Sequence, residues 1–414
     1  MDKKTFDFNN EISKLFECNK KLNVKVRVAD VADTLFCVAN ENAGKKFDIV
    51  FTESDYLKFS KIITGALKRA CAEFSLLLIE DKDFDHVKNK SFFNFNGDIV
   101  IVVGGMDLIS ITSHYASIQN KELYAVLSEP CAEYLLLNKA RIPANGIYAT
   151  VDIKPIKTLI YDINILVKAS NLSYQESFIN VMSKLVTLID YKFRVLITGK
   201  EFNKESYQRV KNAISLVAGI NAYTNRKQVL IYAEAVMATE RVISDVIDDG
   251  TVELYSDTLG LFSSASSKGD RILTAMRSIL ELYEMLFVND LGGVLTVPDY
   301  NADIAFLEKT TGTSGSYFRK NLTIPSPKRI DIINKILIKT RDGFLKEIES
   351  VLFVMKAIEK VYNSFSENNK EDKLPFNAKK EALKTATYLS DKITLLSHMR
   401  DMGVLRCIDE KWFK

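Results

Sequence analysis

The stretch GDIVIVVGGMDLISITSHYA, residues 97–116, decides the fold. It opens with a continuous apolar run, typical of a strand that is buried on both faces, and passes through Gly104 and Gly105 into a segment with helical spacing. Further strand-like runs occupy residues 47–51, 75–80, 122–130 and 157–166. Helical segments lie between most of these runs, and one of them is predicted over residues 56–74. This alternation predicts βαβ units, a parallel sheet, and ligand binding beyond the carboxyl ends of the strands.

The pattern changes at about residue 167, after which long helical segments follow one another to the C-terminus. We therefore expect a Rossmann-like α/β domain with a parallel sheet over residues 1–166. An all-α domain is expected over residues 167–414, with a binding cleft between the two. Within the second domain, SFINVMSKLVTLIDY (177–191) predicts a helix start followed by an amphipathic run, with Asn180 near the opening turn.

Composition narrows the class of protein. The 414 residues are 47% hydrophobic and carry a formal net charge of +3, so large cores can form, and no basic domain indicates a nucleic-acid or membrane partner. The five cysteines form no CxxC pair, which argues against a structural zinc site and a disulfide framework. Residues 1–10 lack the apolar core of a signal peptide, and no apolar run reaches membrane-span length. We expect a cytoplasmic protein.

The turn at Gly104 and Gly105 resembles the phosphate loop of the glycerol-1-phosphate dehydrogenase family, within the dehydroquinate synthase-like and iron-containing alcohol dehydrogenase superfamily. Segments resembling four further family motifs follow in the family's order: AVLSEPCAEY (125–134), KTLIYDINIL (157–166), SFINVMSKLVTLIDY (177–191) and TATYLSDKITLLSHMRDMGVLR (385–406). The resemblance implies a coenzyme site at Gly104, Gly105, Asp107 and Ser128. Thr52 falls near the family's coenzyme-selecting aspartate, which leaves NAD and NADP both open as cofactors.

The resemblance also implies where a catalytic metal would bind. The family uses an aspartate and two histidines, and the corresponding positions here hold Asn180, Arg271 and, less directly matched, Leu291. The chain has three histidines, none paired with another at ligand spacing: His86, His114 and His398. A neutral amide is a poor substitute for a carboxylate on zinc or iron. We therefore expect no metal.

Three functions follow from these residues. The first is a metal-free family member that has lost hydride transfer and binds a nucleotide or phosphorylated small molecule, with Arg271 and Lys184 near the anion. The second is an active NAD(P)-dependent oxidoreductase on a polyol phosphate such as glycerol 1-phosphate or dihydroxyacetone phosphate. In that case Arg271 or Lys184 would stabilise the alkoxide, and Glu133 would donate the proton. The third, a dehydroquinate synthase-like cyclase or lyase, needs the same missing metal. A homo-oligomer is compatible with each of the three.

Overall fold

The structure is a computed structural model, and its described residues form two compact units, which interleave along the sequence. The α/β unit lies within residues 1–143, 149–173 and 215–241, and the helical unit within residues 144–148, 174–214 and 242–414. The described residues are 24–79, 93–130, 135, 138–144, 147–219, 226, 228–230, 232–233, 235–236, 250–262, 267–289, 298–320, 322–365, 375–390 and 393–408. The domain boundary between residues 166 and 167 stays a prediction, and the units are described separately.

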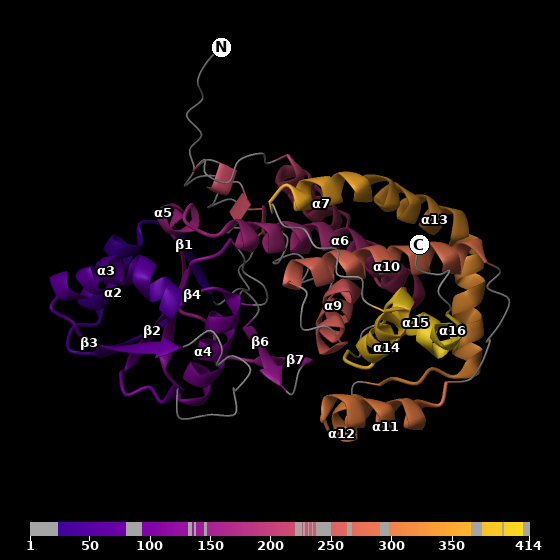
Figure 1. Ribbon diagram of the computed structural model, residues 1–414, viewed down its shortest axis with the longest axis horizontal. Helices are drawn as coiled ribbons and strands as arrows, with labels where there is room; N and C mark the ends of the chain where they lie inside the picture. The colour runs from indigo at the N-terminus through magenta and orange to yellow at the C-terminus, as the bar shows by residue number, and fades with distance from the viewer. Residues whose placement is uncertain are drawn as a thin grey trace, which may run out of the picture. The chain divides into compact units, whose positions relative to one another are not determined.

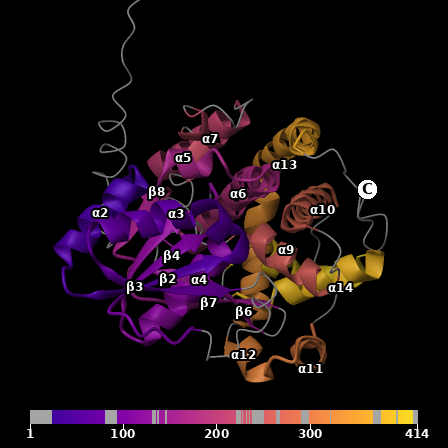
Figure 2. The ribbon, with the colours of Figure 1, turned by 60° about the vertical axis from the view of Figure 1, so that its left-hand side comes forward.

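A six-stranded parallel sheet forms the centre of the α/β unit (Figures 1 and 2). In spatial order its strands are β1 (Lys25–Val28), β8 (Thr158–Tyr161), β5 (Glu122–Leu127), β4 (Ile99–Gly104), β2 (Lys46–Thr52) and β3 (Glu73–Ile79). All six residues of β4 are buried, as its apolar sequence requires for a strand covered on both faces. The predicted parallel sheet is confirmed.

Helices alternate with these strands along the chain. They are α2 (Val31–Glu41), α3 (Glu53–Arg69), α4 (Met106–Ile118) and α5 (Ile163–Leu166). The apolar faces of α2 and α3, together with Ile165 of α5, pack on the sheet around Phe47, Phe51 and Ile101, which are 0% exposed. The helix predicted over residues 56–74 ends earlier, at Arg69, because Cys71 takes a left-handed conformation (φ 53°) and Glu73 already belongs to β3.

Three strands lay outside the sequence-based prediction: β1 and the two-stranded pair β6 (Lys139–Ala144) and β7 (Ile147–Asp152). The sequence of β1, KVRV, places a basic residue at every second position. It therefore lacks the continuous apolar run that marks the central strands.

Helices make up the second part of the chain. They are α6 (Asn171–Thr198), α7 (Lys204–Ala218), α9 (Thr251–Phe262), α10 (Lys268–Val288), α11 (Tyr300–Thr311), α12 (Gly315–Lys320), α13 (Pro327–Asn363), α14 (Phe376–Ala386), α15 (Leu395–Asp401) and α16 (Val404–Cys407). The predicted helix start at Ser177 is wrong, because α6 already begins at Asn171. The Ser173 amide donates to the Ser170 hydroxyl at 3.0 Å and satisfies one of the free N–H groups of the first turn. Asn180 therefore lies in the third turn.

Asp190 of α6 connects four helices of the helical unit. Its carboxylate accepts hydrogen bonds from the Thr251 hydroxyl of α9 at 2.6 Å, the Tyr283 hydroxyl of α10 at 2.9 Å and the Leu395 amide of α15 at 2.9 Å. Burial raises the pKa of Asp190 to about 6, although all three donors favour the charged form. Among the described helices, none is long and apolar enough to cross a bilayer.

Candidate functional site

The turn between β4 and α4 gathers the predicted coenzyme residues. Gly105 precedes the first turn of α4 and supplies no side-chain cap. The Ser128 amide donates to the Gly104 carbonyl at 3.0 Å, which brings the end of β5 beside the turn. On the other side, Thr52 ends β2 and donates to Asp55 at 2.8 Å. The structure therefore places Thr52, Gly104, Gly105, Asp107 and Ser128 along one edge of the sheet, at the carboxyl ends of β2, β4 and β5.

Carboxylates surround this turn. A Cβ atom at Gly105 would lie 2.6 Å from Cδ of Glu129, so the carboxylate of this side chain covers the backbone at Gly105. The Ser173 hydroxyl donates to Glu129 at 3.3 Å. Asp55 lies on the other side, with its Oδ2 atom 3.3 Å from the Cβ position of Gly104. Since Asp107 stands in the first turn of α4, three negative charges border a helix start that would otherwise favour an anion.

Sequence reasoning missed Glu129 and Asp55. A signal for Glu129 was present, because it closely follows the carboxyl end of a parallel strand, where side chains of α/β sheets meet ligands. Asp55 shows no comparable signal, since an acidic residue in a first helical turn is an ordinary helix-start feature.

In the helical unit, a buried ion pair lies on the same face of α6 as Asn180, the residue that the resemblance aligns with a metal ligand. Asn180 and Lys184 stand one turn apart on the same face, and both are buried. The ammonium of Lys184 pairs with the carboxylate of Glu253 on α9, and the two side chains are 1% and 7% exposed. Glu253 lies 69 residues from Lys184 in sequence, so no local spacing could have indicated the pair.

Arg271 contacts α9 at a different place. It stands in the first turn of α10, and its Nε atom lies 3.4 Å from the Cβ position of Gly260. Glu253 and Gly260 are separated by two turns of α9, a rise of about 10 Å. Lys184 of α6 and Arg271 of α10 therefore contact α9 at two separate places, and the structure does not bring their charged groups together. Glu133 and Leu291 lie outside the described residues.

The two described histidines, His114 and His398, are partly or fully buried within helices. His114 lies on α4, where partial burial lowers its pKa. His398 is buried on α15, with its Nε2 atom 2.8 Å from the Asn334 side-chain oxygen, and burial lowers its pKa to about 4. His86 lies outside the described residues. Within the described part of the chain, no group of three or more His, Cys, Asp or Glu side chains could hold a metal ion.

Comparison with known proteins identifies the fold. No family model and no curated protein matches the sequence. Solved structures do match along nearly the whole chain. An alcohol dehydrogenase from Oenococcus oeni has a TM-score of 0.62 and 12% identity, covering 92% of this chain and 97% of its own. The chain has the alcohol dehydrogenase fold.

Two further structures extend this comparison. An iron-containing alcohol dehydrogenase from Thermotoga maritima has a TM-score of 0.57 and 10% identity, covering 93% of this chain and 98% of its own. An NADH-dependent butanol dehydrogenase A from the same organism has a TM-score of 0.55 and 11% identity, with coverages of 90% and 98%. Similarity at such identities establishes the fold and leaves activity to be argued from the site.

Proposed function

We propose that this chain is a binding protein built on the alcohol dehydrogenase fold. In this proposal it has lost metal-dependent hydride transfer and binds a nucleotide or another phosphorylated small molecule. The observation that carries the loss of metal chemistry is the buried ion pair of Lys184 and Glu253 on the same face of α6 as Asn180.

The residues at the family's ligand positions do not fit a catalytic divalent cation. Such a cation prefers carboxylate, imidazole or thiolate ligands, and it acts by polarising a carbonyl or alkoxide. Asn180 offers one neutral amide oxygen, and Lys184 adds a positive charge one turn away. Glu253 already compensates that charge, so its carboxylate is not available to a metal. Arg271 adds a second cation at another ligand position.

The start of α4 supports an anionic ligand. Backbone N–H groups at a helix start attract phosphate, and no side chain of Gly105 competes for them. The carboxylate of Glu129 occupies the space in front of Gly105, but it is the end of a flexible, partly exposed side chain. A bound phosphate would displace it. NAD and NADP are therefore candidate ligands whose binding is weakened by Glu129, and one of the structural neighbours is described as NADH-dependent.

The test uses the purified full chain. Bound metal is quantified by mass spectrometry, and oxidation of NADH and NADPH is followed with dihydroxyacetone phosphate, with and without added Fe²⁺ or Zn²⁺. We expect no stoichiometric metal and no turnover under any of these conditions. Turnover that appears with metal and disappears with chelator would overturn the proposal and establish a dehydrogenase.

The ligand is tested separately by calorimetric titration with NADH, NADPH and inorganic phosphate. Saturable heat with a dinucleotide supports the nucleotide assignment. Heat with phosphate alone restricts the ligand to other phosphorylated molecules, and absence of heat in all three titrations contradicts the ligand assignment.

A further inference from the structure

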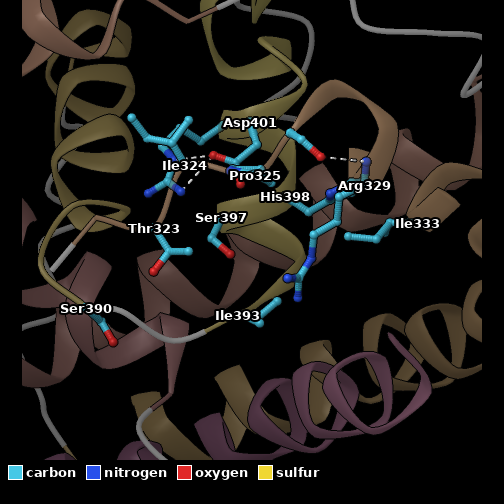
Figure 3. Close-up of a pocket in the computed structure, with 12 residues that line it drawn as sticks. Thr323, Ile324, Pro325, Arg329, Ile333, Ser390, Ile393, Ser397, His398 and Asp401 are labelled. Carbon is cyan, nitrogen blue, oxygen red and sulfur yellow. Dashed lines mark hydrogen bonds and ion pairs between the residues drawn. The ribbon is translucent and has the colours of Figure 1, made fainter. Parts of the chain in front are cut away.

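A cavity of about 240 Å³ opens to the surface of the helical unit, between the segment that leads into α13 and the helix α15 (Figure 3). This is many times the roughly 10–15 Å³ that holds one water molecule. It shares no residue with the turn at α4 or with the ion pair of Lys184 and Glu253. Neither the family resemblance nor the proposed function assigns anything to it.

Two of the charged groups that line the cavity are already compensated. The guanidinium of Arg400 bonds to Asp401 at 2.8 Å through Nε and to the Thr387 carbonyl at 2.6 Å through one terminal nitrogen. His398 is held by the Asn334 side chain and stays neutral at pH 7, because burial lowers its pKa to about 4. These groups together contribute no net charge to the cavity.

Arg329 supplies the remaining charge. Its side chain is exposed, and none of the hydrogen bonds and ion pairs found among the described residues involves its guanidinium. Figure 3 shows Arg329 extending past Ser397 towards Ile393. The helix α13 begins beside it, with Ser326 accepting a hydrogen bond from the Arg329 amide at 3.3 Å, so the positive end of the helix dipole adds to the same potential. Among the lining residues that the structure describes, Arg329 therefore contributes one uncompensated positive charge.

The rest of the lining is divided between apolar and hydroxyl side chains. Ile324, Pro325, Ile333 and Ile393 form the apolar part, and the hydroxyls come from Thr323, Ser326, Ser390 and Ser397. A guanidinium holds a carboxylate through two parallel hydrogen bonds, whereas a phosphate dianion would need more than one cation for balance. We propose that this cavity binds a short-chain aliphatic monocarboxylate, with its carboxylate on Arg329 and its chain against the three isoleucines.

The experiment is a calorimetric titration of the full chain with sodium butyrate at constant ionic strength. Butyramide serves as the neutral analogue and inorganic phosphate as the multivalent anion. The variant Arg329→Gln removes the charge at an exposed position, and Lys328→Gln is its matched control, since Lys328 is the exposed neighbour outside the cavity lining. Ile324→Ala trims an apolar contact at a position that is 57% exposed. Circular dichroism checks that each variant is folded.

We expect saturable binding of butyrate, weakened about tenfold or more by Arg329→Gln and unchanged by Lys328→Gln. Ile324→Ala should weaken the binding of butyrate and leave the binding of acetate, which lacks the longer aliphatic chain, unchanged. Three results would overturn the proposal: no binding of butyrate by the unmodified chain, equal affinity for butyrate and butyramide, or equal effects of the two charge variants. Tighter binding of phosphate than of butyrate would overturn the carboxylate assignment.

Discussion

At the scale of single residues, Lys184 and Glu253 form a buried ion pair between α6 and α9. Two charges that are almost fully removed from water stabilise the fold only as a pair, because each one alone would carry an uncompensated desolvation cost. The pair lies on the same face of α6 as Asn180, the residue that the family resemblance aligns with a metal ligand.

The first prediction concerns this pair. Lys184→Met should lower the free energy of unfolding by about 3–5 kcal/mol, because Glu253 is left buried and unpaired. The double variant Lys184→Met/Glu253→Leu should lower the free energy of unfolding by much less, because no buried charge is left unpaired. Urea denaturation followed by circular dichroism measures both. Lys335→Met is the control, because its partner Asp331 is exposed and such surface pairs contribute about 0–1 kcal/mol. Equal losses in the single and double variants would contradict the interpretation.

The second prediction concerns Asp190 and pH. Its pKa in the folded chain is about 6, against an ordinary value of 3.8, so the folded state takes up a proton that the unfolded state releases. The stabilisation from this proton is complete below about pH 4 and is lost as pH rises through 6. It amounts to roughly 3 kcal/mol.

Asp190→Asn fixes the side chain in a neutral form and should remove this dependence. Denaturation midpoints of both proteins between pH 4 and 7 measure it, with the exposed substitution Asp331→Asn as control. A constant difference between Asp190→Asn and the unmodified chain over this range would show that Asp190 does not titrate there.

How far the sequence predicts the candidate site differs from residue to residue. Lys184 and Arg271 were identified because the family resemblance aligns them with its metal region. Glu253 could not be identified from the sequence, because its role depends on a contact between two helices that are distant in sequence. The resemblance names positions, whereas partners across the fold become visible only in the structure.

At the scale of elements, the turn between β4 and α4 combines a helix start that favours anions with a carboxylate that opposes them. The third prediction follows. Glu129→Gln should raise the affinity for NADH about fivefold, since it removes a negative charge from the position of the phosphate. Calorimetric titration measures the change. Glu122→Gln is the matched control, because Glu122 lies at the opposite end of β5 beside Lys157. An unchanged affinity in Glu129→Gln would place the nucleotide elsewhere.

The elements that could be predicted are those whose burial leaves a local pattern. The strands β2, β4, β5 and β8 are almost wholly buried, so the sequence of each is mostly apolar. The start of α6 was placed too late, because its first turn is largely exposed and polar and shows no apolar periodicity. The local sequence thus predicts buried strands more accurately than it predicts the residue at which a helix begins.

At the scale of the whole molecule, the proposed absence of a metal site gives the fourth prediction. A metal bound at one hundred times its dissociation constant would add about 2.7 kcal/mol to stability and raise the melting temperature by a few degrees. Addition of Zn²⁺ or Fe²⁺ after chelation should leave the melting temperature unchanged in a thermal scan. A rise that reverses with chelator and follows one bound ion per chain would contradict the proposal.

The change from α/β to helical structure was predictable, because the hydrophobic period shifts along the sequence. The interleaving of the two units along the chain could not be predicted from the sequence. Residues 215–241 belong with the α/β unit although they follow the long helix α6. A segment's membership in a unit depends on long-range contacts, which leave no periodicity of their own.

The position of β1 at the edge of the sheet has a consequence for synthesis of the chain. Its partner β8 is made much later, and the Val31 amide reaches its acceptor Asp162 only 131 residues further on. At about 5–20 residues per second, the ribosome needs roughly 7–25 seconds to deliver that partner. During this interval the nascent chain carries an incomplete sheet, and an open strand edge is prone to pair with other chains. A protein of this topology therefore depends on how the cell shields the earlier strands until β8 has emerged.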